Sequence, residues 1–204
     1  MARKGNLIVV SGPSGAGKGT ICQEMFRQHC DLQYSISATT RAPRTGEVDG
    51  VNYLFVAKAQ FETMIEQDDL LEWAEVYGNY YGTPRSYVME MLASGKDVVL
   101  EIDTQGALQV KKKFPEGIFI YIVPPSLEEL SKRIYNRGTD APDVIERRLS
   151  CAKEELICAS EYNYVVVNDQ LDQAVDKVRA IIVAERCRVQ RNLDVVDEVL
   201  HTSC

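Results

Sequence analysis

Histidine, tryptophan and paired cysteines are scarce in this chain. Among its 204 residues there are two histidines and one tryptophan, and the six cysteines are scattered without a C-x-x-C pair. A metal site or a disulfide framework needs regular ligand or cysteine spacing, so both are disfavoured. We therefore expect free thiols in a reducing compartment and no Ser-His or Cys-His catalytic set.

Long apolar runs and excess positive charge are also missing. No stretch approaches the roughly 18 apolar residues of a membrane-spanning helix, and residues 1–4 lead into the first predicted strand without a signal-peptide hydrophobic region. The net charge of −7 would repel nucleic acids and anionic membranes, so we expect neither as a partner. These features predict a cytoplasmic protein, and they leave a homo-oligomer open.

What the chain does contain is an alternation of strand and helix patterns. Its length suits a single α/β domain, and its composition, 45% hydrophobic and 26% charged, is ordinary for a globular protein. Such alternation predicts a parallel sheet with right-handed crossovers. The strands are predicted at 7–11, 34–37, 53–56, 97–102, 118–123 and 165–167, and the helices at 17–29, 59–67, 85–94, 104–113, 127–136, 143–160 and 170–191.

Residues 38–94 interrupt this alternation and are predicted to form an inserted subdomain. Within it, 39–47 is too rich in proline and glycine for regular structure, and 78–82 is predicted to be a turn. The tail 192–204 is amphipathic but carries no motif. The core of the predicted single domain, 1–204, is assigned to 1–37, 95–125 and 161–191.

The most informative motif lies between the first strand and the first helix. A G-x-x-x-x-G-K pattern in this context indicates phosphate binding, because glycines let successive backbone N–H groups point into one concavity at a helix N-terminus. Lys18 can reach the β and γ phosphates. A glycine-rich turn without a ligand is the disfavoured alternative. The residues of this loop are Gly12, Pro13, Ser14, Gly15, Ala16, Gly17, Lys18, Gly19 and Thr20.

One position departs from the usual form of the motif. Gly19 stands where serine or threonine normally supplies a hydroxyl to Mg²⁺, and Thr20 carries a hydroxyl one position further along. Direct ligation of the metal by this loop is therefore in question.

With these residues in view, the chain resembles the guanylate kinases, which are P-loop nucleoside monophosphate kinases, over nearly its whole length. The resemblance implies a three-layer P-loop core with a parallel sheet, an inserted GMP-binding subdomain (38–94) and a lid (126–160). It also implies transfer of the γ-phosphoryl group of ATP to GMP, giving ADP and GDP, in purine nucleotide metabolism. The blocks that carry it are 12–18 (GPSGAGK), 39–47 (TTRAPRTGE), 78–83 (GNYYGT), 101–103 (EID) and 167–169 (VND).

Such a reaction needs no general base, because the acceptor is a phosphate monoester that is already anionic. It needs positioning and charge neutralisation between two anions. The resemblance assigns the acceptor phosphate to Arg41 and Arg44, with phenolic hydrogen bonds from Tyr53 and Tyr81. Guanidinium groups suit phosphate oxygens. Solvated surface arginines and core tyrosines are the alternatives.

Guanine recognition is assigned by the resemblance to Glu72, with Ser37, Thr83 and the carboxylate of Asp103. A carboxylate can accept both N1–H and N2–H₂ of guanine, whereas adenine presents an acceptor at N1. From the residues alone, a single glutamate before a tryptophan is more often a solvated helix charge, so the assignment of Glu72 depends mainly on the resemblance. We expect dGMP to be accepted as well as GMP, because no identified residue reads the 2′-hydroxyl.

Further cationic and polar residues are assigned to the donor side. By resemblance Arg133, Arg137 and Arg148 belong to the lid and act on the transferring group together with Lys18 and Arg41, and Asn168 binds the adenine of ATP. Surface i,i+4 charges and an ordinary turn asparagine are the alternatives.

A Mg²⁺ ion is expected through water near Glu101 and Asp103, which follow a buried strand where ligand-facing groups gather in open α/β sheets. Strand-end acids that satisfy nearby donors are the alternative.

Two other functions stay open. A non-catalytic guanylate-kinase-like interaction module would keep the fold, but such modules typically have damaged phosphate loops, and this loop is intact. A kinase of the same fold acting on AMP or a phosphorylated ribose is the other. The residue types at Gly19 and Thr20 resemble those of the adenylate kinases, whereas the blocks 41–47 and 79–83 do not resemble that family.

Overall fold

The computed structural model describes residues 4–28, 31–76, 78–136 and 142–201, with the backbone alone at 136 and 142–148. Its centre is a five-stranded sheet in which every pair of neighbouring strands is parallel, in the order β2-β7-β1-β8-β9. This confirms the predicted parallel α/β fold. The strands are β1 (Leu7–Ser11), β2 (Leu32–Tyr34), β7 (Asp97–Glu101), β8 (Ile118–Val123) and β9 (Tyr164–Val167).

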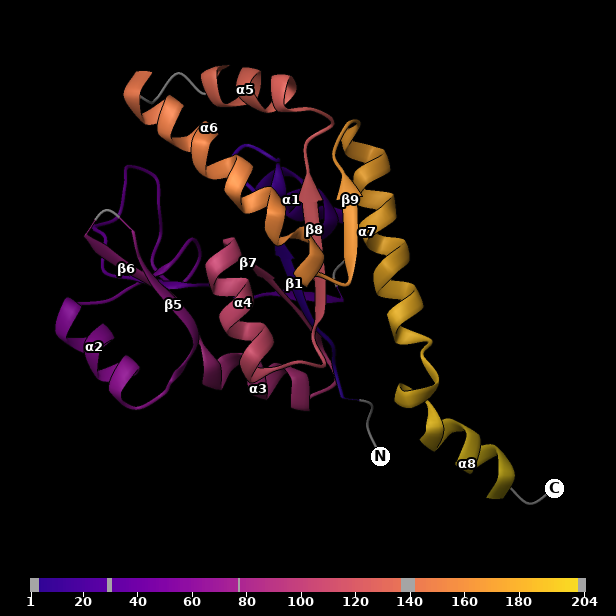
Figure 1. The fold of residues 1–204 in the computed structure, drawn as a ribbon. Coiled ribbons are helices and arrows are strands. Elements are labelled where there is room, and N and C mark those ends of the chain that lie inside the picture. The colour runs from indigo at the N-terminus through magenta and orange to yellow at the C-terminus, as the bar shows by residue number, and fades with distance from the viewer. Residues whose placement is uncertain (1–3, 29–30, 77, 137–141, 202–204) are drawn as a thin grey trace.

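Helices cover both faces of this sheet, so the core has three layers (Figure 1). Ile8 and Val10 of β1 pack with α1 (Lys18–Gln28) and α7 (Leu171–Arg186). Leu7 and Val9 of the same strand pack on the other side with α3 (Arg85–Ala93) and α4 (Thr104–Lys113). Because side chains alternate along a strand, a continuous apolar run buries both faces, as predicted.

A second, smaller sheet lies beside the core, at the left of Figure 1. It has the strand order β4-β3-β6-β5 and a small apolar centre of its own, which includes Phe61. All of it falls within the predicted insertion, whereas the following helix α3 packs on the core. Its elements are β3 (Ala38–Thr39), β4 (Leu54–Phe55), α2 (Lys58–Glu66), β5 (Leu70–Val76) and β6 (Asn79–Pro84).

One strand prediction and one turn prediction were wrong in this region. The strand predicted at 34–37 divides, because β2 ends at Tyr34 and β3 begins at Ala38. The turn predicted at 78–82 is largely strand β6, which pairs antiparallel with β5. Gly82 is glycine for another reason: a Cβ there would lie 2.8 Å from the carbonyl oxygen of Glu72. A glycine that permits close packing of strands was misread as a turn signal.

Two helices follow the fourth strand of the core and lie above the phosphate loop in Figure 1: α5 (Leu127–Asn136) and α6 (Pro142–Ile157), with a 3₁₀ turn at Cys158–Glu161. Ser126 caps α5, because the Glu129 N–H donates to Ser126 Oγ at 3.0 Å. A Cβ at Gly15 would come within 2.9 Å of side-chain atoms of both Leu130 and Ile134, so α5 packs directly on the loop.

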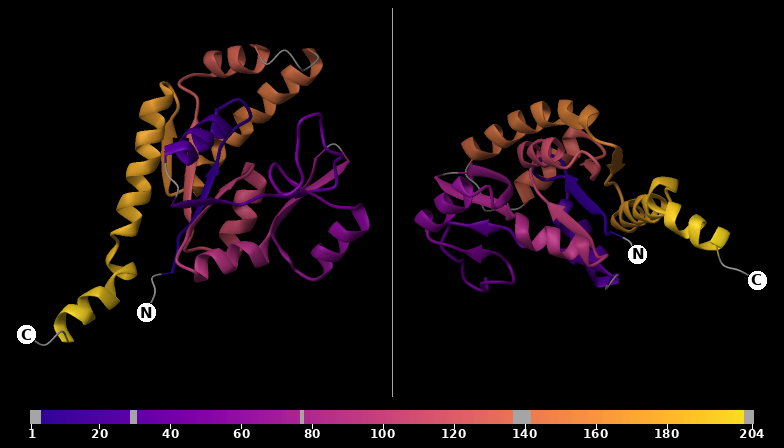
Figure 2. Two further views of the ribbon diagram at one scale, coloured as in Figure 1. Left: turned by 180° about the vertical axis from the view of Figure 1, so that it is seen from behind. Right: turned by 90° about the horizontal axis from the view of Figure 1, so that it is seen from below.

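The last predicted helix was too long. Helix α7 ends at Arg186, a 3₁₀ turn follows at Val189–Arg191, and α8 (Leu193–His201) extends away from the core, as Figure 2 shows from two sides. In the part of the chain that the structure describes, none of the helices combines the length and apolar character needed to cross a bilayer. Of the six cysteines, Cys22, Cys151, Cys158 and Cys187 are free thiols, and the other two lie outside the described residues.

Candidate active site

The phosphate loop joins β1 to α1 at the carboxyl edge of the central sheet, which is where the sequence places it. Its glycines adopt backbone angles that other residues rarely take: φ is +91° at Gly17. A Cβ at Gly17 would also lie 2.3 Å from Nδ2 of Asn168, so the loop can approach the neighbouring strand end only without a side chain. The predicted strand, glycine loop and helix are therefore confirmed as one unit.

Lys18 is folded back on this loop. Its ammonium donates to the carbonyl oxygens of Gly12 at 2.6 Å and Pro13 at 3.1 Å. Burial lowers the pKa of Lys18, while the carboxylates of Glu101, Glu155 and Asp103 act to raise it. The carbonyl oxygens of the loop thus hold the Lys18 ammonium in place, close to three carboxylates.

Asn168, the residue that follows β9, supports the loop. Its Nδ2 donates to the carbonyl oxygen of Ala16 at 2.8 Å, and the side chain is buried. The structure therefore gives this side chain a contact that the sequence did not suggest, and adenine binding by Asn168 stays a prediction.

Glu155 of α6 is a site residue that the sequence reading missed. The backbone N–H of Ser14 donates to its carboxylate, and its Oε2 is buried without a hydrogen-bond partner among the described residues. Burial raises the pKa of Glu155, and Lys18 acts to lower it. A glutamate within a helix carries no signal of this role, because only the crossing of α6 over the loop creates the contact.

The residues predicted to bind the acceptor meet at a cavity of about 230 Å³ between the two sheets. Its lining includes five of the eight predicted acceptor residues: Ser37, Tyr53, Glu72, Tyr81 and Asp103. They come from segments far apart in the sequence, and the insertion brings them to the carboxyl edge of the core sheet. Thr83, which lies behind Glu72, and Arg41, which lies beside the tyrosines, complete the group around it.

Glu72 is buried at 5% exposure on β5, and it is not a solvated surface charge. Thr83 Oγ1 donates to its Oε1 at 2.6 Å. Burial raises the pKa of Glu72 to about 7, the hydrogen bond from Thr83 acts to lower it, and Asp103 adds a further rise. A Cβ at Gly106 of α4 would lie 2.6 Å from Glu72 Oε2, so the glycine in that helix makes room for the carboxylate.

Arg41 is held in place before any ligand is bound. Its Nη2 and Nη1 donate to the two carboxylate oxygens of Glu47 at 2.9 and 3.0 Å, and its guanidinium lies 5.4 Å from the ring centroid of Tyr53. The rings of Tyr53 and Tyr81 meet edge to face at 6.1 Å. Glu47 also accepts from the backbone N–H of Arg44, whose side chain is exposed. The 39–47 block contained Glu47, but nothing in the sequence indicated that it holds Arg41.

The predicted lid arginines are placed only in part. Nε of Arg133 donates to Glu129 Oε1 at 2.9 Å within α5, which is the i,i+4 pair that the sequence left as an alternative. Arg137 and the side chain of Arg148 lie outside the described residues. Their roles stay predictions.

The two strand-end acids differ in their contacts. Asp103 caps α4, because its Oδ1 accepts from the Gly106 N–H at 2.7 Å. Glu101 ends β7 beside the phosphate loop and accepts a hydrogen bond from the Tyr34 hydroxyl. Within the described residues no three His, Cys, Asp or Glu side chains are arranged to hold a metal on their own. A metal here would need phosphate oxygens as well.

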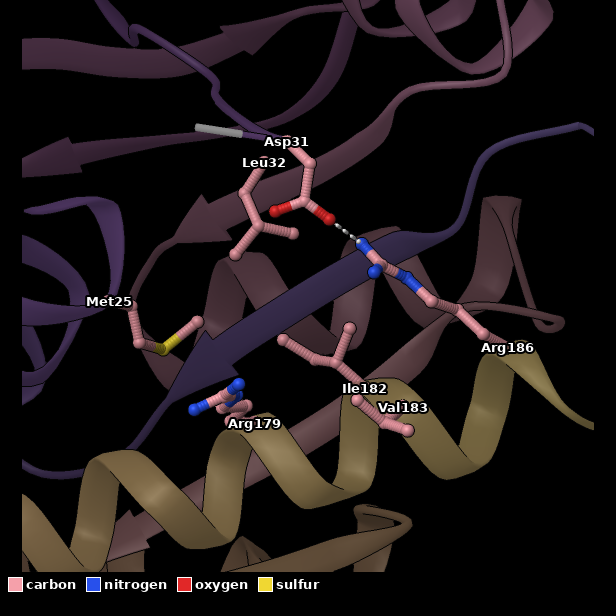
Figure 3. Close-up of a pocket in the computed structure, with 7 residues that line it drawn as sticks. All are labelled: Met25, Asp31, Leu32, Arg179, Ile182, Val183 and Arg186. Atoms are coloured by element: carbon pink, nitrogen blue, oxygen red, sulfur yellow. Dashed lines mark ion pairs between the residues drawn. The ribbon is translucent and has the colours of Figure 1, made fainter. Parts of the chain in front are cut away.

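A separate cavity of about 130 Å³ lies between α1, β2 and α7 (Figure 3). Its lining includes Met25, Leu32 and Ile182, and an ion pair of 2.8 Å between Arg186 and Asp31 borders it. None of the predicted site residues lines it, so it takes no part in the site described above.

Comparison with known proteins gives the family. A family model described as guanylate kinase matches residues 4–185. The guanylate kinase of Caldanaerobacter subterraneus subsp. tengcongensis is 60% identical over 192 residues, which cover 94% of this chain and 93% of that protein. The guanylate kinase of Desulfitobacterium hafniense is 60% identical over 187 residues, covering 92% and 94%.

A solved structure agrees with these sequences. The crystal structure of guanylate kinase from Anaplasma phagocytophilum superposes with a TM-score of 0.78 at 32% identity, over 96% of this chain and 95% of that one. The phosphate loop and the acceptor cavity thus occur in a chain that these relatives match over more than nine-tenths of its length, and this chain belongs to the guanylate kinase family.

Proposed function

We propose that this chain is a cytoplasmic enzyme of purine nucleotide metabolism that transfers the γ-phosphoryl group of ATP to GMP, giving ADP and GDP, and that it also accepts dGMP. The observation that carries this proposal is the buried carboxylate of Glu72 at a cavity beside an intact phosphate loop. A phosphate loop alone fits many nucleotide-binding proteins, whereas a buried acid at the acceptor cavity indicates a particular base.

On the donor side, the backbone amides of 12–18 would cradle the ATP phosphates, and Lys18 would supply a full positive charge. To do so, its ammonium exchanges the carbonyl oxygens of Gly12 and Pro13 for phosphate oxygens. The gain comes from electrostatics that are arranged in advance, since loop and helix are already built when ATP arrives. Asn168 would keep the loop in shape and meet the adenine ring.

On the acceptor side, Arg41 and Arg44 would bind the phosphate of GMP, with hydroxyls from Tyr53 and Tyr81. The stacking of Arg41 on Tyr53 and its pairing with Glu47 reduce the entropy that it loses on binding. The acceptor oxygen is already anionic, so these residues position it and screen its charge, and none of them removes a proton.

Glu72 would choose the base. Its ionised form can accept both N1–H and N2–H₂ of guanine, whereas adenine would leave a buried carboxylate facing an acceptor. With a pKa of about 7, the ionised form is available at neutral pH, and two guanine donors would favour it further. Ser37, Thr83 and Asp103 would complete the contacts with the base.

Mg²⁺ would enter with the ATP phosphates and lower the charge that the two nucleotides present to each other. The residues present fit this role, because Gly19 leaves beside the loop a space that a Cβ would fill, and Glu101 faces it. Glu101 and Asp103 are the residues of this chain that would hold the metal.

Closure would exclude water. We propose that the inserted region and the lid, 126–160, close over the two nucleotides, with Arg133, Arg137 and Arg148 reaching the transferring group. Because α3 packs on the core sheet, the part of the insertion that moves would end before Arg85.

A panel of acceptors tests the proposal. ADP release is measured with ATP and Mg²⁺ and each of GMP, dGMP, AMP, UMP and CMP. We expect turnover with GMP and dGMP at least about 100-fold above the others, which is the discrimination available to a site with buried polar partners. Preference for AMP would refute the assignment of Glu72, and no turnover with any acceptor would indicate a binding module.

A further inference from the structure

The side chain of Glu155 extends from α6 to the phosphate loop. The Ser14 N–H donates to its carboxylate, and the charge of Lys18 acts on the same group. A backbone N–H and an ammonium are the two kinds of group that such a loop offers to a phosphate. A carboxylate of the chain itself therefore takes partners that suit the phosphates of a nucleotide.

The backbone of Glu155 is fixed by the core. The Tyr121 hydroxyl of β8 donates to its carbonyl oxygen at 2.6 Å. Ala152, three positions earlier on α6, is buried against Leu130 and Ile134 of α5. This end of α6 therefore stays in place, whereas the carboxylate, at the tip of a flexible side chain, can change its partners.

A second set of polar groups is buried without partners. The hydroxyl oxygens of Ser11, Thr104 and Tyr162 make no hydrogen bond within the described part of the chain, and neither does Oε2 of Glu155. Buried polar groups nearly always have partners, so unpaired ones need an explanation. Hydroxyls are donors as well as acceptors, and what they lack here is an acceptor that a carboxylate would supply.

The three hydroxyls lie together, and Glu155 has room to move toward them. Burial raises the pKa of Tyr162 to about 12, and the hydroxyls of Ser11 and Thr104 act to lower it, so the three groups are neighbours. Thr104 and Glu155 line one cavity of about 340 Å³ between α4 and α6. A carboxylate that leaves the loop can therefore cross this cavity to new donors.

We propose that Glu155 is a positioning residue that serves as the phosphate loop's own anion: its carboxylate holds α6 on the loop, and the donor phosphates displace it onto the three hydroxyls. The inference rests on the proposed function in taking nucleotide phosphates as the ligand of the loop. Carboxylate and phosphate repel each other at close range, so the loop cannot hold both without a loss of affinity. Binding of the donor is thereby coupled to the position of a side chain on α6, the helix that carries Arg148.

The test measures ADP binding by calorimetry in EDTA, where the phosphates carry their full charge and no phosphoryl transfer takes place. Glu155→Gln retains an oxygen that can accept from the Ser14 N–H but loses the charge. We expect ADP to bind at least about fivefold more tightly to this variant than to wild type, and inorganic pyrophosphate, which lacks the base, to show a similar gain. A merely structural role would weaken binding instead. Equal or weaker binding of ADP would overturn the proposal.

Glu154→Gln is the matched control, since it removes the same charge from the neighbouring, exposed position of α6. Adjacent positions of a helix point about 100° apart, so the two side chains do not share one set of partners. We expect the ADP affinity of this variant to stay within about twofold of wild type. If it rose as much as in Glu155→Gln, net charge would explain the gain and the proposal would be wrong.

A second variant tests the place to which the carboxylate moves. Thr104→Val replaces a hydroxyl by a methyl group of similar size, so the displaced carboxylate loses a donor. We expect ADP affinity to fall at least about threefold when Glu155 is present. In Glu155→Gln the same change should alter it by less than about twofold, because an uncharged side chain is not driven from the loop.

No loss in Thr104→Val alone, or the same loss in both backgrounds, would overturn the displacement. Absence of GMP turnover in the acceptor panel would refute the proposed reaction instead and leave these ADP measurements intact.

Discussion

In the proposed reaction the phosphate loop and the acceptor cavity both bind phosphate groups. The two regions bind them with different parts of the chain. The loop uses backbone amides and carbonyls, with a lysine that its own carbonyl oxygens hold. The acceptor cavity uses side chains held by other side chains: Arg41 by Glu47, and Glu72 by Thr83. The loop lies on the five-stranded core, whereas most of the cavity belongs to the small second sheet.

This difference determines how each region should respond to mutation. A backbone cradle survives the loss of any one side chain, so a change at Lys18 should affect the reaction more than the binding of the other substrate. In the cavity each side chain positions its neighbour, so a change should alter affinity and specificity. The following predictions test this contrast.

The largest effect is expected at Lys18. Lys18→Ala should lower kcat by about 100- to 1,000-fold, because a charge placed in advance beside the transferring group is lost. The affinity for GMP, measured by calorimetry, should stay within about threefold. Lys58→Ala, which removes an exposed lysine of α2, is the control. If Lys18→Ala lost as much GMP affinity as it lost in kcat, the phosphate loop and the acceptor cavity would not act separately.

The next effect is expected at Glu72. Glu72→Gln should lower kcat/KM for GMP by about 100-fold, near 3 kcal/mol, because an amide cannot accept both guanine donors. ADP binding at the phosphate loop should change by less than about threefold. Glu75→Gln, an exposed position on the same strand, is the control. If GMP turnover stays within about threefold of wild type, the role assigned to Glu72 is wrong.

The same variant should make the free protein more stable at alkaline pH. Burial raises the folded pKa of Glu72 to about 7, above its ordinary value of 4.5. Between these values the folded chain retains a proton that the unfolded chain has lost, so wild type loses stability as pH rises and does not regain it above pH 7.

Glu72→Gln has no such proton to lose. The free energy of unfolding of the variant should therefore exceed that of wild type by an amount that grows from pH 5 to pH 8 and reaches on the order of 2 kcal/mol. Urea unfolding of both proteins at the two pH values measures it. A difference that is constant or shrinks would show that the carboxylate is well solvated.

The smallest effect is expected at Glu47. Glu47→Gln removes the charged partner of Arg41 but leaves the guanidinium stacked on Tyr53. We expect KM for GMP to rise about fivefold, near 1 kcal/mol, with kcat within about twofold. Glu62→Gln on the surface of α2 is the control. An unchanged KM would mean that the ion pair does not position Arg41.

Sequence patterns predicted the core better than the insertion, for a physical reason. Strands buried on both faces, such as β8, carry continuous apolar runs, and their helices carry caps and periodic apolar positions. In the insertion the two-residue strand β3 was missed and β6 was predicted as a turn, whereas the strand predicted at 53–56 contains β4. Gly82 was misread as a turn residue, because the residues around it in the sequence do not show that β5 packs against it.

The candidate site divides in the same way. The phosphate loop was predictable because its function lies in backbone conformation, which a local run of glycines encodes. Three contacts were not predictable: Glu47 with Arg41, Glu155 with Ser14, and Glu101 with Gly19. The partners in the last two are 141 and 82 positions apart in the chain.

By itself, the amino-acid sequence determined the parallel α/β core and the phosphate loop. These depend on local backbone preference and on the alternation of apolar residues, which neighbouring positions encode together. Only the tertiary structure decided that Glu72 is buried, that Arg41 is held by Glu47 and that Glu101 fills the space beside Gly19. The charge state and direction of a side chain depend on what surrounds it, and the surroundings come from the packing of distant segments.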